Sequence, residues 1–239
     1  MRRDMCTAAA HGAHATTPAR WVRAGWVGTA TSGAVMAVMA AATFALAGCV
    51  SVGIGDEPAA HQQLRLVDAG TDAVSPRAAP LLPALLVQPQ PADAVADTLA
   101  IAYTRTPQSF AFYQHASWTE RPVRRLTRLL QERLQKRGVA AAVGQLGDPL
   151  SSEWLLALRV ETLHHEVATA PGQAQVALVA ELFDRRTRQR VAQQRLSASA
   201  PVASVDAAAA VAAMSVAVGR AFDELVPWLE TALSAHAER

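Results

Sequence analysis

The sequence predicts an α+β domain in which two principal helices pack on one face of a mainly antiparallel sheet. Strand-like patterns come first, a helix follows, three more strand patterns come next, and a long helix closes the chain. The connections between the last three strands are too short for helical crossovers, so these strands form an antiparallel meander. With 51% hydrophobic and 18% charged residues among 239, the chain has the composition of a folded protein.

The first strand patterns are short and interrupted. Residues 64–67 are a strand candidate, and residues 68–80 are expected to form a loop because they are rich in Gly, Ser, Asp and Pro. Residues 81–87 are apolar, but Pro83 cannot donate a ladder hydrogen bond, which favours an edge strand.

A hairpin follows. Residues 98–105 and 109–115 carry β-favouring bulk on either side of a turn at residues 106–108. The aromatic side chains of this segment and Trp118 are expected to form a plug between the hairpin and the next helix.

Residues 120–137 are the first principal helix. Thr119 suits the N-cap, Pro122 falls in the first turn, and Gly138 suits a left-handed stop. The leucines recur at helical spacing and predict a packed stripe, whereas the charged face is expected to contact water. The residues expected on that water-facing side are Arg121, Arg124, Arg125, Arg128, Glu132 and Arg133.

The second half of the domain contains four further strand patterns and a long helix. The strands expected there are 139–143, 154–161, 176–182 and 189–198, and the second and third alternate with a period of two. Residues 206–236 form the second principal helix, with Ser204 as the expected cap and a kink or break at Pro227. The apolar residues expected to face the sheet are Val211, Met214, Val218, Phe222, Leu225, Leu229 and Leu233.

The basic balance of the chain belongs to its N-terminal segment. Four of the 22 Lys and Arg and one of the 20 Asp and Glu lie in residues 1–48, which leaves 18 basic and 19 acidic residues in 49–239. A basic domain face is therefore missing, and we expect no nucleic-acid partner. Only Cys49 remains after residue 48, so the domain has no internal disulfide and no cysteine-based metal cluster.

The N-terminal segment has the pattern of a lipoprotein signal peptide. Arginines precede an uncharged stretch, residues 24–48, whose apolar part is too short for a good membrane span. The segment ends in Leu46, Ala47 and Gly48 before Cys49, which resembles the bacterial lipobox. We therefore expect residues 1–48 to be a signal peptide, Cys49 to carry acyl chains such as palmitate, and 49–63 to be a lipidated tether, of which residues 50–63 reach ~45 Å at most. Since Val50 is not an Asp, the outer membrane is favoured, with the domain facing the periplasm.

No catalytic site, metal site or cofactor is expected in the domain. His164 and Glu166 share one strand face while His165 points to the other, and two ligands are too few for zinc. A nucleophile elbow, a phosphate-binding glycine loop and a His-Glu-x-x-His motif are all missing from residues 49–239. A Ser/His/Asp site assembled from distant residues stays open, because such triads are recognised by geometry.

The segment from Ile101 to Leu130 resembles the ABC-type transport auxiliary lipoprotein family, which includes PqiC-like proteins. The matching positions, made of packing residues, are Tyr103, Arg105, Phe110, Tyr113, Trp118, Leu126, Leu129 and Leu130. The resemblance assigns residues 64–239 to the domain of this family. It implies an outer-membrane lipoprotein that works without catalysis, and its implied partners are an MCE-domain protein and the permease and ATPase of an ABC transporter that moves lipid between membranes. Some relatives form rings, so a homo-oligomeric ring is a further expectation.

Two other classes stay open at the level of sequence. A lipid-anchored periplasmic hydrolase requires a pocket with perturbed acids and bases. A lipoprotein plug that assists outer-membrane assembly requires a β-barrel partner. The cargo, the transport direction and the contact residues do not follow from the sequence.

Overall fold

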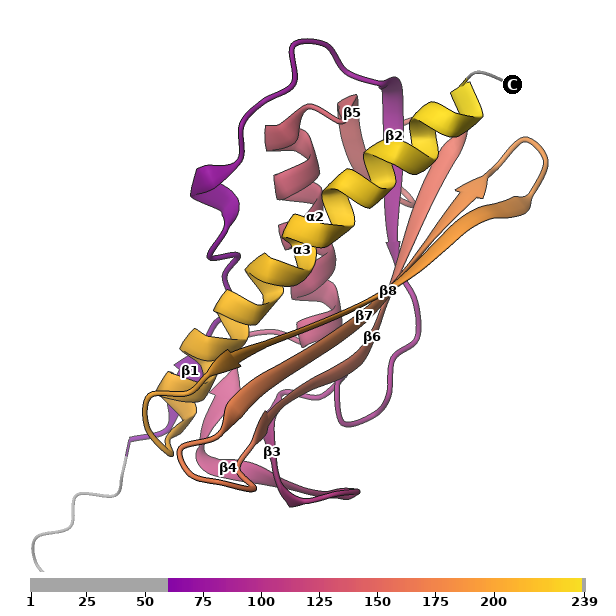
Figure 1. The fold of residues 1–239 in the computed structure, drawn as a ribbon. Helices are drawn as coiled ribbons and strands as arrows, with labels where there is room; N and C mark the ends of the chain where they lie inside the picture. Colours follow the sequence, from indigo (N-terminus) through magenta and orange to yellow (C-terminus); the bar gives the residue numbers. More distant parts are fainter. Residues whose placement is uncertain (1–59, 238–239) are drawn as a thin grey trace, which may run out of the picture. The chain divides into compact units, whose positions relative to one another are not determined.

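The computed structural model describes residues 60–237, which form an α+β fold (Figure 1). The class is confirmed, and the sheet is mixed rather than purely antiparallel. The elements, in chain order, are β1 (Gln62–Leu64), a 3-10 turn η1 (Thr71–Ala73), β2 (Leu82–Pro89), β3 (Ala100–Thr106), β4 (Ser109–Trp118), α2 (Pro122–Arg137), β5 (Ala140–Gln145), β6 (Trp154–Glu166), β7 (Gln173–Asp184), β8 (Gln189–Pro201) and α3 (Ala207–Ala237).

Strand β6 is the centre of the sheet. On one side it pairs along its whole length with β7, and β7 pairs with β8, so the antiparallel meander is confirmed. On the other side β6 is shared: β2 pairs with residues 155–158, and β3 pairs with residues 165–166, both in parallel. The antiparallel hairpin β3–β4, as expected from the sequence, and the parallel pairs β2–β5 and β1–β4 complete the mixed sheet.

The expectation that residues 81–87 form an edge strand is wrong. Strand β2 lies between β5 and β6. Pro83 is tolerated there because pairing with β6 starts only at Leu86, and the proline itself is exposed. A proline therefore marks the part of β2 that has a neighbour on one side only.

The two helices end as expected but begin elsewhere. Helix α2 starts at Pro122 with Arg121 at the N-cap and no side-chain cap, so the expected Thr119 cap is wrong. The Thr119 N–H instead donates to the Leu64 carbonyl, 2.9 Å away, which extends the β1–β4 pairing. Gly138 ends the helix in the left-handed region (φ 72°), as expected, and its N–H donates to the Leu134 and Gln135 carbonyls.

Helix α3 is capped by Asp206, not by Ser204. The Ala209 N–H donates to Asp206 Oδ1 at 2.8 Å, and the Ser204 hydroxyl donates to the same carboxylate. The helix runs through Pro227 without the expected break. Pro227 is exposed, so water can bond the carbonyl that the proline leaves without its helical partner.

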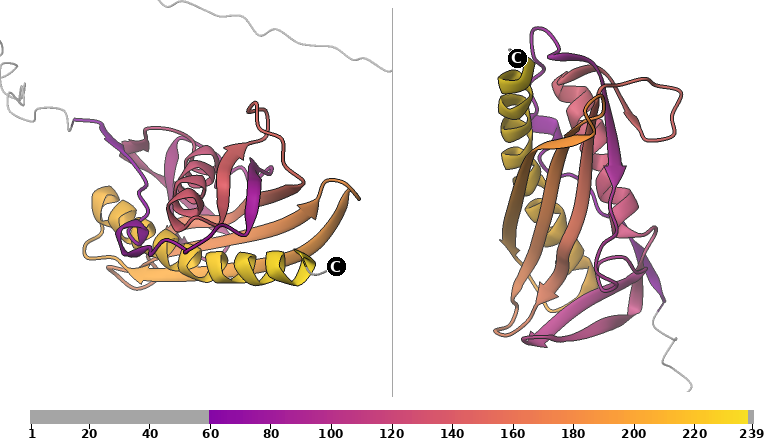
Figure 2. Two further views of the ribbon diagram at one scale, coloured as in Figure 1. Left: turned by 90° about the horizontal axis from the view of Figure 1, so that it is seen from above. Right: turned by 90° about the vertical axis from the view of Figure 1, so that its right-hand side faces the viewer.

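Both helices contribute to one hydrophobic core, with α2 against β2 and β5 and α3 against β7 and β8 (Figure 2). The predicted stripes are the buried faces. From α2 and α3 the buried residues include Leu126, Leu129, Leu130, Leu134, Met214, Val218, Phe222, Leu225, Leu229 and Leu233.

Candidate functional surface

The expected lipobox lies outside the described residues. Leu46, Ala47, Gly48 and Cys49, with the signal peptide and most of the tether, therefore stay predictions. The described chain adds one fact about the tether: its last two predicted residues, 62 and 63, belong to β1 and pair with β4.

The residues singled out by the family resemblance divide between the core and the surface. Trp118 is 5% exposed, and Leu126, Leu129 and Leu130 are buried beside it in the core. Phe110, by contrast, is 43% exposed, and its neighbour Phe112 is 44% exposed. Trp118 alone among the large aromatic residues of this segment is a core plug, and the two phenylalanines form a surface.

Tyr103 and Tyr113 are the partly buried aromatic residues of the same hairpin. Their ring centroids are 5.1 Å apart, and the Arg105 guanidinium lies over the Tyr103 ring at 5.1 Å. Burial, followed by the charge of Asp206, raises the pKa of Tyr113 to about 12. The tyrosine is therefore a neutral hydrogen-bond donor at any physiological pH.

The donor has a defined acceptor in His165. Tyr113 Oη lies 2.7 Å from His165 Nδ1, and His165 Nε2 lies 2.7 Å from the Pro171 carbonyl. Because a carbonyl only accepts, Nε2 carries the proton and Nδ1 accepts from the tyrosine. Burial lowers the pKa of His165, so the ring is neutral and fastens the β6–β7 turn to the hairpin.

The alternation expected at residues 164–166 is present, although His165 is a buried side chain and not part of a solvated strand end. His164 is partly exposed and meets the edge of the Phe110 ring at 5.3 Å. Glu166 accepts a hydrogen bond from Gln175 at 2.9 Å. Phe110, His164, Glu166 and Gln175 line an open groove of about 560 Å³ between the hairpin and β6–β8. Within residues 60–237, no group of three or more potential metal ligands occurs.

The charged face of α2 departs most from expectation. Arg125 and Arg133 were placed on the water side, yet both are buried, and Arg133 is 1% exposed. Arg125 Nε donates to the Leu66 carbonyl at 2.9 Å. The signal for Arg133 is present in the sequence, since it follows Leu129 by four residues and Leu130 by three, which puts it within the leucine stripe.

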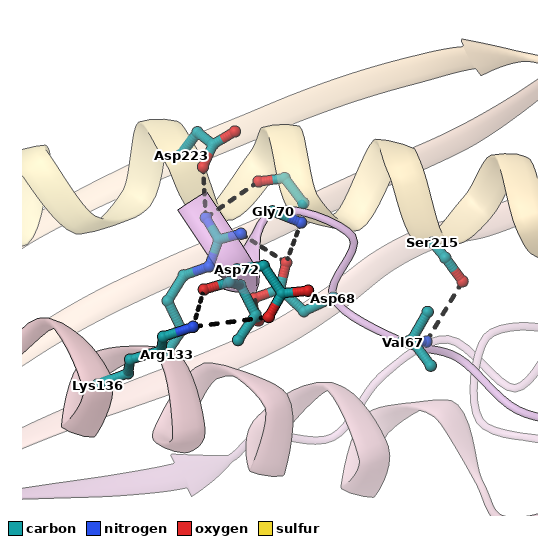
Figure 3. A network of polar contacts seen from close by, with 10 residues as sticks. Val67, Asp68, Gly70, Asp72, Arg133, Lys136, Ser215 and Asp223 are labelled. Carbon is teal, nitrogen blue, oxygen red and sulfur yellow. Dashed lines mark hydrogen bonds and ion pairs between the residues drawn. The ribbon is translucent and has the colours of Figure 1, made fainter. Parts of the chain in front are cut away.

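Arg133 joins three segments of the chain (Figure 3). Its guanidinium holds both oxygens of Asp68 at 2.5 and 2.6 Å, and it donates to Asp223 Oδ1 at 2.5 Å and to the Gly219 carbonyl at 3.3 Å. The Asp68 side chain is as buried as that of Arg133, whereas the Asp223 side chain is 62% exposed. The strong member of the network is therefore the bidentate pair with Asp68.

The loop that carries Asp68 is held on both sides. The Val67 N–H donates to Ser215 Oγ on α3 at 3.3 Å, and Lys136 on α2 donates to the Thr71 carbonyl at 2.6 Å. Asp68 also accepts from the Gly70 N–H at 3.1 Å. The segment directly after β1 is thus fixed between the two helices.

Comparison with known proteins gives one family and a small set of similar folds. The model of the ABC-type transport auxiliary lipoprotein component family matches residues 64–226. Protein XCC0632 from Xanthomonas campestris, whose crystal structure assigns it to the family model DUF330, is 23% identical with a TM-score of 0.62, over 74% of this chain and 98% of that one. The PelC dodecamer from Paraburkholderia phytofirmans is 16% identical with a TM-score of 0.36, over 64% and 92%.

None of the curated proteins compared with the chain matches it. Within the part of the chain that the structure describes, no helix has the length and apolar character needed to cross a membrane.

Proposed function

The chain belongs to the family of ABC-type transport auxiliary lipoprotein components, and from this premise we propose that it is a periplasm-facing lipoprotein of the outer membrane. Its role is to dock or assemble an MCE/ABC-type system that moves lipid between membranes. In this proposal the domain performs no catalysis, and its surface carries the function.

One observation carries the proposal: the family domain begins at residue 64, a short tether after a lipobox that ends in Cys49. A thiol at this position accepts diacylglycerol, and two or three acyl chains make membrane attachment stable. Val50 after the cysteine favours the outer membrane over the inner one.

The polar groups of the described domain fit a docking role. Three of the buried charged side chains are held in structural contacts: Arg133 pairs with Asp68, and Glu181 contacts Arg190 and Gln90. The buried histidine, His165, has both ring nitrogens engaged. These groups stabilise the fold, which leaves recognition to the surface.

The test is crosslinking in the native membrane followed by identification of the partners. We expect an MCE-domain protein, with or without the ABC permease and ATPase, to be recovered with the parent chain. The matched control is Cys49→Ser, which loses both the acyl chains and the partner. Recovery of a β-barrel assembly protein in place of an MCE protein contradicts the proposed role.

Two further readouts test the finer parts of the proposal. Mass spectrometry of the membrane-extracted chain should show a mature N-terminus at an acylated Cys49, and an unmodified cysteine contradicts the anchor. We also propose, from the family resemblance, that the domain forms a homo-oligomeric ring. Crosslinked species larger than a dimer support it, and a monomer at all concentrations contradicts it.

A further inference from the structure

One end of the domain gathers the exposed apolar side chains of the hairpin. Three connections lie at this end, at the bottom of the view in Figure 1: the β3–β4 turn, the β6–β7 turn and the segment between β8 and α3. Phe110 and Phe112 are 43% and 44% exposed, and Val205 is 49% exposed. Isolated exposed apolar residues are common, but here they share one surface, which we call the hairpin end and define by residues 105–115, 167–172 and 201–205.

The hairpin end carries few charges. Its three segments contain no Asp or Glu and one residue with a permanent charge, Arg105, while Glu166 and Asp206 directly flank the second and third segments. Arg105, Phe112 and Val205 line a shallow hollow of about 270 Å³. A cation beside aromatic and aliphatic side chains matches the phosphate and the upper acyl carbons of a phospholipid.

The first described residues of the chain lie at this end of the domain. Strand β1 runs parallel to β4, with Gln62 beside Ala116, and Ala60 lines a hollow with His115 and Val205, so the chain just before Gln62 lies at the hairpin end. The turn is seven residues from Ala116 along β4, which is at most roughly 23 Å because β4 is irregular between Phe112 and Ser117. Residues 49–61 span roughly 40 Å when extended, which is enough to reach past the turn.

We propose that the hairpin end contacts the phospholipid bilayer that holds the anchor, with Phe110 and Phe112 inserted at the headgroup level and Arg105 beside the phosphates. This inference rests on the proposed lipid anchor at Cys49. The anchor holds the domain near the membrane, and the hairpin end fixes which side of the domain faces it. The sheet and helices then project away from the bilayer toward the periplasm.

The experiment uses the full chain reconstituted into vesicles of phosphatidylethanolamine and phosphatidylglycerol. Phe110→Cys carries an environment-sensitive fluorophore, and quenching by doxyl-labelled phospholipid is measured. The matched control is Leu146→Cys, which is also exposed (48%) but lies beside Val87, far along β6 from the hairpin end. The parent chain, labelled in parallel, is the blank for native cysteines.

We expect a blue shift of emission and a loss of intensity by lipid quenching at position 110, and neither at position 146. Equal, low quenching at both positions in a chain with acylated Cys49 overturns the inference and leaves the anchor intact. Shielding of position 110 only after an MCE protein is added also overturns it, since the hairpin end then binds protein. If Cys49 is unmodified, the anchor proposal fails. Quenching at position 110 then still supports bilayer contact of the hairpin end, and its absence overturns that contact.

Discussion

Replacing Arg133 with methionine is the perturbation with the largest expected effect on stability. Methionine keeps most of the volume of the arginine stem but removes every polar contact of its guanidinium. The Asp68 carboxylate then stays buried with only the Gly70 N–H and the Thr71 hydroxyl as donors. Removing one partner of a buried ion pair costs about 3–5 kcal/mol, because the remaining charge is left without compensation.

The expected loss is large enough for a simple assay. Urea unfolding of the purified full chain, monitored by circular dichroism, should give a free energy of unfolding lower by about 3–5 kcal/mol. Thermal unfolding should give a Tm lower by about 6–20 °C. Asp223→Asn removes the exposed partner of the same arginine and should cost at most about 1 kcal/mol. The two variants share the network and differ in burial.

A double variant separates charge burial from packing. Arg133→Met combined with Asp68→Leu replaces both members of the pair with apolar groups, and such replacements are often close to neutral. We therefore expect the double variant to recover much of the loss of the single one. A single Arg133→Met variant within 1 kcal/mol of the parent, or equal to Asp223→Asn, refutes the reasoning that the pair with Asp68 is buried and structural.

Three further changes test other parts of the fold. Gly219→Ala should lower the free energy of unfolding by about 1–3 kcal/mol in urea although alanine favours a helix, because its Cβ would lie 2.9 Å from the Gly70 nitrogen. Gly138→Ala should cost about 1 kcal/mol or more by the same measurement, because of its φ of +72°. For His165, burial lowers the pKa, so the unfolded chain binds more protons. Stability should fall as pH drops below about 6.5, with a slope of at most about 1.4 kcal/mol per pH unit from this residue, and His165→Gln should flatten the pH dependence of Tm.

Two of these changes have a matched control. Ala212→Gly, at an exposed position of the same helix, measures the helix propensity of α3 without a clash. If Gly219→Ala stabilises the chain by the amount that Ala212→Gly destabilises it, the close contact with the loop is wrong. For the pH prediction the comparison variant is His164→Gln. Burial lowers the pKa of His164 as well, so this variant shows how much of the pH dependence comes from the second histidine. An unchanged pH dependence in His165→Gln contradicts the assigned role of His165.

Much of the fold was predictable because it depends on local periodicity. The leucine stripe of α2, the apolar face of α3 and the strands of the meander each repeat within a few residues. The place of β2 was not predictable in this way. Its neighbour β6 lies almost 70 residues away, and the pairing depends on a parallel crossover that leaves no local pattern.

The candidate surface shows the same division. Trp118 packs as expected, but the hydrophobicity of Phe110 does not show which side of the hairpin the core covers. The pairing of β4 shifts register between Ala100–Ser117 and Ala102–Phe112, and this irregularity changes which side chains face inward. For Arg133, the charge predicted exposure. Its carboxylate partner, Asp68, lies 65 residues away in the sequence and compensates the cost of burying the guanidinium.

The geometry of β1 has a mechanical consequence. A pull on the chain that precedes Gln62 acts along β1, so the hydrogen bonds to β4 are loaded together in shear and do not open one after another. Directly after β1 in the chain, the Leu66 carbonyl accepts a hydrogen bond from Arg125, and Asp68 accepts one from Arg133. Tension on the N-terminal side is therefore transmitted to helix α2. This makes β1 and the segment after it resistant to force applied through the N-terminal chain by a partner or a moving membrane.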